Sequence, residues 1–244
     1  MYRVRNSLLI ALMLTPTLGG LPVLARPLSA GDVAIIGFNM DDPDELAFVA
    51  LASIPAGTVI SFTDNGWKSP EELFRTGEGV SNFTVPAGGI AAGVVTSAPI
   101  GSMSFSATGD QIFAFEGSID GGTGALTGTL LFGLNDDGAS VWQATAADTN
   151  TSALPAALGS SGAAVALTEI DNAIFNTAAL ASGTKAQWLV AITNPANWSG
   201  SDATRQTMPT GPISVTVVPE PMGVGIFLAA AACAILRSRR RIGA

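Results

Sequence analysis

The stretch Gly31–Trp67 reads "GDVAIIGFNMDDPDELAFVALASIPAGTVISFTDNGW" and contains three short apolar runs separated by polar residues. The runs cover Asp32–Phe38, Leu46–Ala52 and Thr58–Phe62, and their length is typical of β-strands rather than of helices. Between them lie "DDPDE" and "IPAGT", whose Pro, Gly and Asp residues favour turns. We therefore expect three successive strands at the start of an all-β domain.

The same pattern continues through the next hundred and fifty residues or so. The dipeptide Asn65-Gly66 predicts a tight hairpin, because both residues tolerate positive φ. Residues 144–163 show little periodicity and predict either a long loop or a short helix. Many short strands with regular turns indicate an antiparallel, immunoglobulin-like β-sandwich. The further predicted strands are Gly101–Phe105, Gln111–Phe115, Leu130–Leu134, Ala163–Leu167, Trp188–Ile192 and Ile213–Val217.

The N-terminal residues have the three parts of a secretory signal peptide. Arg3 and Arg5 supply the positive region, and the apolar run Leu8–Leu18 follows them. We expect residues 1–25 to be removed by cleavage after Ala25, with Ala30 as the alternative cleavage position. The other interpretation is an uncleaved membrane anchor, for which the apolar run is short.

The C-terminal residues 222–236 are apolar throughout and predict a short transmembrane helix. At a rise of 1.5 Å per residue this helix would be about 22 Å long, against a hydrocarbon thickness of about 30 Å. It is therefore either a thin span or a segment that a sorting enzyme reads and removes. The basic tail 237–241 follows, and clustered arginine remains on the cytoplasmic side. The predicted organisation is a signal peptide (1–25), one domain (26–218) and a C-terminal segment (219–244).

The charge of the predicted domain limits its partners. The whole chain has a net charge of −8, but residues 26–218 hold only five basic residues against eighteen acidic ones. Nucleic acids and anionic lipids need a cationic surface and are excluded as partners on this ground. Divalent cations remain compatible. Cys233 is the only cysteine and lies in the apolar tail, so no internal disulfide can form.

The absence of histidine removes most catalytic arrangements. A Ser-His-Asp triad, a Cys-His pair and any imidazole metal site are excluded. Ser182 and Lys185 match the S-x-x-K spacing of some acyl enzymes, but Gly183 follows the serine and we expect a turn there. We therefore predict that the protein is not an enzyme. The alternative is a polysaccharide hydrolase that uses two carboxylates across a cleft.

Two acidic turns are candidate calcium sites, because calcium takes six to eight oxygen ligands from carboxylates and loop carbonyls. One is the sequence "NDDG" at residues 135–138, and the alternative for both turns is ordinary solvation. Calcium is the only cofactor that the sequence suggests. The other turn, the stronger candidate, contains Asp41, Asp42, Asp44 and Glu45.

Two of the four tryptophans lie in turn-rich stretches. Trp67 follows "DNG" and Trp198 follows "NPAN". An exposed indole face can stack on a sugar ring, whereas a buried one fills the core. Trp67 and Trp198 are therefore candidate sugar-stacking residues, with core packing as the alternative.

The C-terminal segment, with "VPEP" at 218–221, an apolar helix and an arginine cluster, resembles the PEP-CTERM sorting signal of bacterial exported proteins, which also bears the label of an ice-binding protein C-terminal domain. The resemblance covers about the last 26 residues and implies a membrane-embedded exosortase as partner. It also implies export to the envelope or the extracellular space in a Gram-negative bacterium that makes exopolysaccharide. The implied recognition residues are Pro219, Glu220 and Pro221, held at the membrane by Arg237, Arg239, Arg240 and Arg241.

The body of the chain is similar to an uncharacterised module of bacterial extracellular proteins and to lamin-tail-type immunoglobulin-fold domains. The stretches that carry this similarity are Gly31–Trp67, "FRTGEG" (74–79), "SATGDQIFAFEG" (106–117) and "NPANWSGSD" (194–202). Together with the tail, they imply an exported structural or adhesive protein that associates with exopolysaccharide or other surface proteins. The third expectation is an inert domain that displays or spaces another component.

Overall fold

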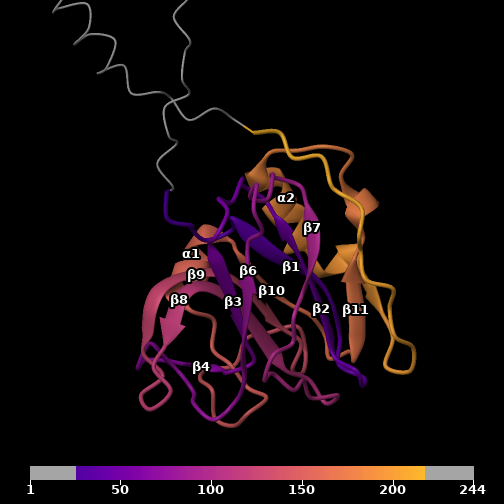
Figure 1. The fold of residues 1–244 in the computed structure, drawn as a ribbon. Coiled ribbons are helices and arrows are strands. Elements are labelled where there is room, and N and C mark those ends of the chain that lie inside the picture. Colours follow the sequence, from indigo (N-terminus) through magenta and orange to yellow (C-terminus); the bar gives the residue numbers. More distant parts are fainter. Residues whose placement is uncertain (1–25, 218–244) are drawn as a thin grey trace, which may run out of the picture.

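The computed structural model describes residues 26–217, which fold mainly into β-strands (Figure 1). The predicted signal peptide, the Pro-Glu-Pro triplet, the apolar helix and the arginine cluster lie outside the described residues. Within residues 26–217, none of the helices has the length and apolar character needed to cross a membrane.

Two five-stranded sheets form the body of the domain. The first has the order β12-β11-β1-β2-β7 and is antiparallel throughout. The second has the order β10-β9-β8-β3-β6 and is antiparallel except for the pair β9 and β10. The first sheet contains β1 (Val33–Asn39), β2 (Glu45–Ala50), β7 (Val95–Ala98), β11 (Asn172–Phe175) and β12 (Trp198–Gly200); the second contains β3 (Val59–Thr63), β6 (Val80–Thr84), β8 (Gln111–Ile119), β9 (Leu126–Asn135) and β10 (Ala164–Ala166).

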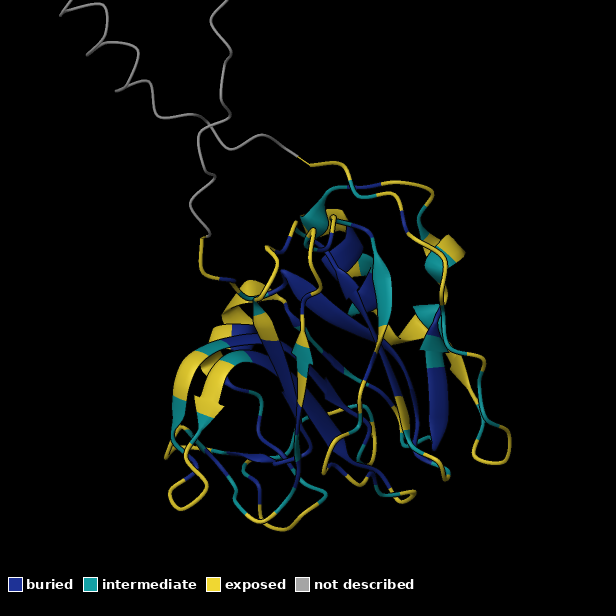
Figure 2. Cartoon of the chain, viewed as in Figure 1, coloured by how far each residue is buried: buried dark blue, intermediate teal, exposed yellow. Residues whose placement is uncertain are grey.

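The two sheets pack face to face around one apolar core (Figure 2). Phe48 of β2 meets Phe62 of β3 and Phe83 of β6, with ring centroids 5.3 Å apart in both pairs. Rings at this separation and tilt interact favourably, in addition to the apolar area that they remove from water. The predicted all-β fold is therefore confirmed at the level of a β-rich domain whose body is two packed five-stranded sheets.

A small aromatic cluster lies at the second sheet and includes a two-stranded ribbon. The ribbon pairs β4 (Trp67–Lys68) with β5 (Leu73–Phe74). Phe74 contacts both Trp67 and Phe113 of β8, with centroids 5.0 and 5.4 Å apart. The predicted hairpin at Asn65-Gly66 is wrong, because β4 pairs with β5 and not with β3. Gly66 is needed there for another reason: a Cβ at this position would collide with the carbonyl oxygen of Thr151.

Six of the nine predicted strands are confirmed, namely those that correspond to β1, β2, β3, β8, β9 and β10. Gly101–Phe105 is not a strand, and Ile213–Val217 makes only an isolated bridge through Val215. Trp188–Ile192 belongs to helix α2 (Lys185–Ile192). The uncertain stretch 144–163 is mostly loop, with the short helix α1 (Ala156–Ser161) near its end.

Helix α2 forms where the sequence offers a start signal. Thr184 is its N-cap and exchanges hydrogen bonds with Gln187, which completes a capping box. Trp188 is fully buried, packs against Phe175 and donates its indole N–H to the carbonyl of Ser214 at 3.0 Å. Two short 3-10 helices, η1 (Thr177–Ala179) and η2 (Pro195–Asn197), flank α2.

The sandwich has two distinct ends. Residues 26 and 217 lie at the same end, which we term the chain-terminal end (Figure 1). The distal end is made by the loops that follow β1, precede β8 and follow β9, β10 and β12. Backbone hydrogen bonds tie these loops together, for example Met40 N–H to Asp171 O at 2.8 Å and Asp136 N–H to Asp110 O at 2.9 Å.

Candidate functional site

The acidic turn 41–45 lies at the distal end, but its side chains are held by separate partners. Asp41 accepts a hydrogen bond from Asn172 Nδ2 at 2.8 Å, and Asp44 accepts one from the Phe105 backbone N–H at 2.9 Å. Glu45 forms an ion pair with Arg205 at 2.7 Å, and Asp42 is exposed. Among residues 26–217, no three acidic side chains are arranged to hold one metal ion. Calcium binding at this turn stays a prediction.

The structure separates the two candidate stacking tryptophans. Trp67 is 8% exposed and packs edge-on against Phe74, and its backbone N–H bonds Ser152 Oγ at 2.8 Å. The indole of Trp67 therefore packs in the core, which is the alternative role expected for this residue. Trp198 is only partly buried and lines a groove of about 460 Å³.

Rigid contacts hold the Trp198 ring in this groove. Its indole N–H donates to the carbonyl of Ile192 at 2.7 Å, and the ring contacts Phe175 and Phe38 at centroid distances of 6.2 and 6.4 Å. The ring comes from β12, an edge strand of the first sheet, which pairs with β11 on its inner side. The indole is thus positioned before any ligand arrives, which lowers the entropy cost of binding.

The rim of this groove, which we term the Trp198 groove, is polar and has unused hydrogen-bonding capacity. The hydroxyls of Thr177, Ser199 and Thr207 line it and have no side-chain partner within residues 26–217. Asn197 donates its amide nitrogen to Ala191 O at 2.8 Å, which leaves its amide oxygen available. Asn176 uses its oxygen to cap η1, which leaves its amide nitrogen available. The groove thus offers a ligand one apolar ring face together with hydroxyl and amide groups for hydrogen bonding.

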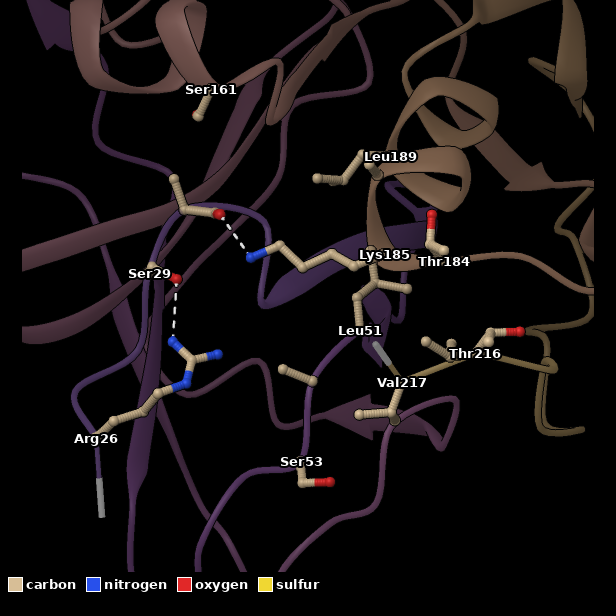
Figure 3. A pocket seen from close by; sticks show the side chains of 14 residues that line it. Arg26, Ser29, Leu51, Ser53, Ser161, Thr184, Lys185, Leu189, Thr216 and Val217 are labelled. Atoms are coloured by element: carbon tan, nitrogen blue, oxygen red, sulfur yellow. Dashed lines mark hydrogen bonds between the residues drawn. The ribbon is translucent and has the colours of Figure 1, made fainter. Parts of the chain in front are cut away.

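A second pocket, of about 750 Å³, lies at the chain-terminal end (Figure 3). Lys185 reaches from α2 to the buried Asp32, with Nζ 2.6 Å from Oδ1, and also donates to Ala30 O at 3.1 Å. Arg26 pairs with the same carboxylate at 3.2 Å. Burial opposes ionisation of Asp32, but the hydrogen bonds from Lys185 and Ser29 hold its pKa below the ordinary value.

Lys185 is also the lysine of the S-x-x-K motif, so its contacts bear on the catalytic interpretation of that motif. The predicted turn at Ser182–Lys185 is wrong in part, because α2 begins at Lys185. The Nζ atom of Lys185 contacts the Asp32 carboxylate and the Ala30 carbonyl, and it makes no hydrogen bond to Ser182 within residues 26–217.

Three carboxylates are buried at the distal end, and none is more than 2% exposed: Asp64, Asp110 and Asp136. Asp64 accepts the backbone N–H groups of Gly79 and Ser104, at 2.7 and 2.9 Å. Asp110 accepts those of Gln111 and Ser106, at 2.8 and 3.0 Å. Burial raises the pKa of all three. These carboxylates tie loops together through backbone N–H groups, and none of the three is exposed at the surface.

A further pocket at the distal end, which we term the acidic pocket, has a volume of about 570 Å³. Four separate loops supply its walls, and none of the lining residues is basic. Asp171 is 9% exposed, and its Oδ1 has no hydrogen-bond partner within residues 26–217. Burial, then the charges of Asp41 and Asp202, raise the pKa of Asp171. The lining residues are Ala107, Thr108, Asp137, Gly138, Glu169, Asp171 and Asp202.

Sequence reasoning identified Trp198 but missed the rest of its groove. Of the acidic pocket it identified only Asp137 and Gly138, which belong to the candidate calcium turn 135–138. The turn chemistry of "NPANW" marks Trp198 as a surface residue, whereas Thr207 approaches only because the chain returns along the first sheet. Glu169, Asp171 and Asp202 are isolated acids in the sequence, and only the loop arrangement brings them together. Comparisons with protein-family models, with curated proteins and with solved structures find no match to this chain.

Proposed function

We propose that this protein is an exported, immunoglobulin-like β-sandwich module that binds polysaccharide outside the cytoplasm. The observation that carries the proposal is the Trp198 groove, where one fixed indole ring lies among hydroxyls and amides with free hydrogen-bonding capacity. Sugars combine apolar ring faces with equatorial hydroxyls, so such a groove provides a partner for each.

The placement of the chain ends supports a display role. Residues 26 and 217 both lie at the chain-terminal end, away from the loops of the distal end (Figure 1). In the proposed arrangement, residues 1–25 are a cleaved signal peptide, and residues 219–244 are sorted by an exosortase-type enzyme, with or without retention of a short transmembrane helix. The domain then presents its distal end to the surrounding matrix. The role is structural or adhesive and involves no catalysis.

The groove is tested by substituting Trp198 in the full-length protein and measuring co-sedimentation with the exopolysaccharide of the producing bacterium. Dextran, xylan and alginate serve as defined comparison polymers. We expect Trp198→Ala to weaken binding about tenfold, which corresponds to roughly 1.4 kcal/mol. Trp198→Phe retains an aromatic face and should lose less.

The matched control is Trp142→Ala, because Trp142 is also partly buried and packs on a phenylalanine, Phe113, at a centroid distance of 5.7 Å. Both alanine variants lose an aromatic contact in the fold, but only one of them alters the groove. Equal binding by the two alanine variants, or no binding of any polymer by the unmodified protein, would overturn the proposal.

A further inference from the structure

The acidic pocket concentrates negative charge without a compensating cation. Asp137, Glu169, Asp171 and Asp202 line it. The nearest basic residue along the chain from Asp202 is Arg205, whose guanidinium pairs with Glu45 at 2.7 Å and also binds the Asp41 carbonyl. Asp171 is the buried carboxylate among these four, and a buried carboxylate is normally paired with a cation or supplied with hydrogen-bond donors, which Asp171 lacks within residues 26–217.

One carboxylate in the wall of this pocket has no hydrogen-bond partner within residues 26–217, and this observation is independent of the count of acids. It belongs to Asp171, which is 9% exposed and whose Oδ1 is buried without a donor. An acceptor removed from water without a donor costs about 1–3 kcal/mol, and a ligand with N–H groups would recover that energy.

The size of the pocket and the spacing of its acids favour a molecular cation over a metal ion. No three acidic residues within the described part of the chain converge on one metal position, and a volume of about 570 Å³ greatly exceeds a bare ion. Carboxylates spread over a wide pocket suit a larger molecule with an ammonium group, which donates three hydrogen bonds and carries the opposite charge.

The Trp198 groove and the acidic pocket lie on one continuous piece of chain. Strand β12 begins at Trp198, and Asp202 follows two residues after the strand ends at Gly200. At about 3.3 Å per residue, the backbone from Trp198 to Asp202 spans at most about 13 Å. An extended oligosaccharide that stacks on Trp198 and follows edge strand β12 would therefore reach the acidic pocket.

We propose that the acidic pocket binds a primary ammonium group on a polysaccharide, so that the protein selects polymers that contain free amino sugars. The inference rests on the proposed function, because it places the sugar chain in the Trp198 groove. It adds the substrate class, since a neutral polymer would leave the acidic pocket unoccupied.

The test compares two oligosaccharides of equal length, one with free amines and one in which each amine is acetylated and therefore uncharged. Calorimetry of the full-length protein near neutral pH and at low ionic strength measures the affinity for glucosamine hexasaccharide and for its N-acetylated counterpart. We expect the amine form to bind about tenfold more tightly, and this preference to shrink with added salt, because exposed charge interactions are screened. Spermidine and calcium chloride are titrated separately as free cations.

Glu169→Gln and Asp202→Asn should each reduce the preference for the amine several-fold. Neither side chain makes a hydrogen bond within the described residues, so the substitutions remove charge without breaking a contact of the fold. The control is Glu71→Gln, an exposed acid on the turn between β4 and β5.

The inference is overturned if both oligosaccharides bind equally, if Glu169→Gln behaves like the Glu71→Gln control, or if only spermidine or calcium binds. Its failure is distinguishable from failure of the proposed function. Equal affinities that still depend on Trp198 would retain the groove and remove the acidic pocket, whereas no oligosaccharide binding at all would remove both.

Discussion

The buried carboxylates at the two ends of the sandwich differ in whether a basic side chain pairs with them. Arg26 and Lys185 both neutralise Asp32 at the chain-terminal end. At the distal end, Asp64, Asp110 and Asp136 are buried without an ion pair within residues 26–217, and they rely on backbone N–H groups. The folded state therefore favours the protonated form of several distal carboxyl groups, and stability depends on pH through them.

Glu78 is the residue at which this dependence is most readily measured. Burial, followed by the charge of Asp64, raises its pKa from 4.5 to about 7, although Arg75 opposes the shift and Asp148 adds to it. Between these two values the folded state binds more protons than the unfolded chain. The free energy of unfolding therefore falls as the pH rises from about 4.5 to about 7.

We predict that Glu78→Gln raises the melting temperature by a few degrees at pH 8 and has little effect at pH 4.5, where the wild-type side chain is already neutral. Thermal unfolding followed by circular dichroism across this pH range measures the difference. The control is Glu71→Gln, which should shift the curve uniformly or not at all. A melting temperature of Glu78→Gln that falls below wild type at pH 8 would contradict the prediction.

Among the secondary-structure elements, α2 is the one that the apolar pattern of the sequence assigned wrongly, as a strand at Trp188–Ile192. An apolar run such as Trp188–Ile192 has the length of a buried strand, and periodicity alone does not distinguish the two. The deciding signal lies just before it, where Thr184 and Gln187 have the spacing of a capping box. The strands β1, β2 and β3 were predictable because Pro, Gly and Asp mark both ends of each run.

The remaining elements depend on contacts that are remote in sequence. Strands β11 and β12 are short and pair only because the chain returns to the edge of the first sheet. Thr207 therefore reaches the Trp198 groove, and Asp171 the acidic pocket, only through the path of the folded chain. A single sequence does not reveal that path. The turn before Trp198 allowed its partial exposure to be predicted. The same signal precedes Trp67, but Trp67 is buried because it packs against Phe74, a contact that the sequence does not show.

The capping box of α2 provides a prediction at this scale. Thr184→Ala removes the side chain that accepts the N–H of Gln187 and should lower the free energy of unfolding by about 1 kcal/mol. Urea denaturation measures this change. Thr210→Ala is the control, since Thr210 is exposed and makes no side-chain hydrogen bond within residues 26–217. Equal stability of the two variants would show that the cap does not stabilise the fold.

At the scale of the whole molecule, the proposed export and sorting can be tested by cell fractionation. We expect replacement of Pro219, Glu220 and Pro221 by alanine to leave the protein in the membrane fraction, because the sorting enzyme no longer recognises it. Mass spectrometry of the released wild-type protein should give an N-terminus at Arg26 and loss of the residues after the triplet.

Ile242→Ala is the matched control for the triplet substitution, because it lies beyond the arginine cluster and should be sorted normally. Release of the triplet variant at the wild-type level would contradict a role for these three residues in sorting.

The position of the chain ends also has a mechanical consequence. If a bound polymer pulls on the distal end while the C-terminus is attached, the tension runs lengthwise through the strands and must shear many backbone hydrogen bonds at once. The segment 213–217 is different, because few hydrogen bonds hold it. The N–H groups of Ile213 and Thr216 donate to Gly93 O and Gly183 O, at 2.9 and 2.7 Å. Ser214 O accepts from the Gly183 N–H at 3.1 Å and from the Trp188 indole N–H at 3.0 Å. Under load this segment would detach first and lengthen the connection to the anchored C-terminus, while both sheets and both proposed ligand sites stay intact.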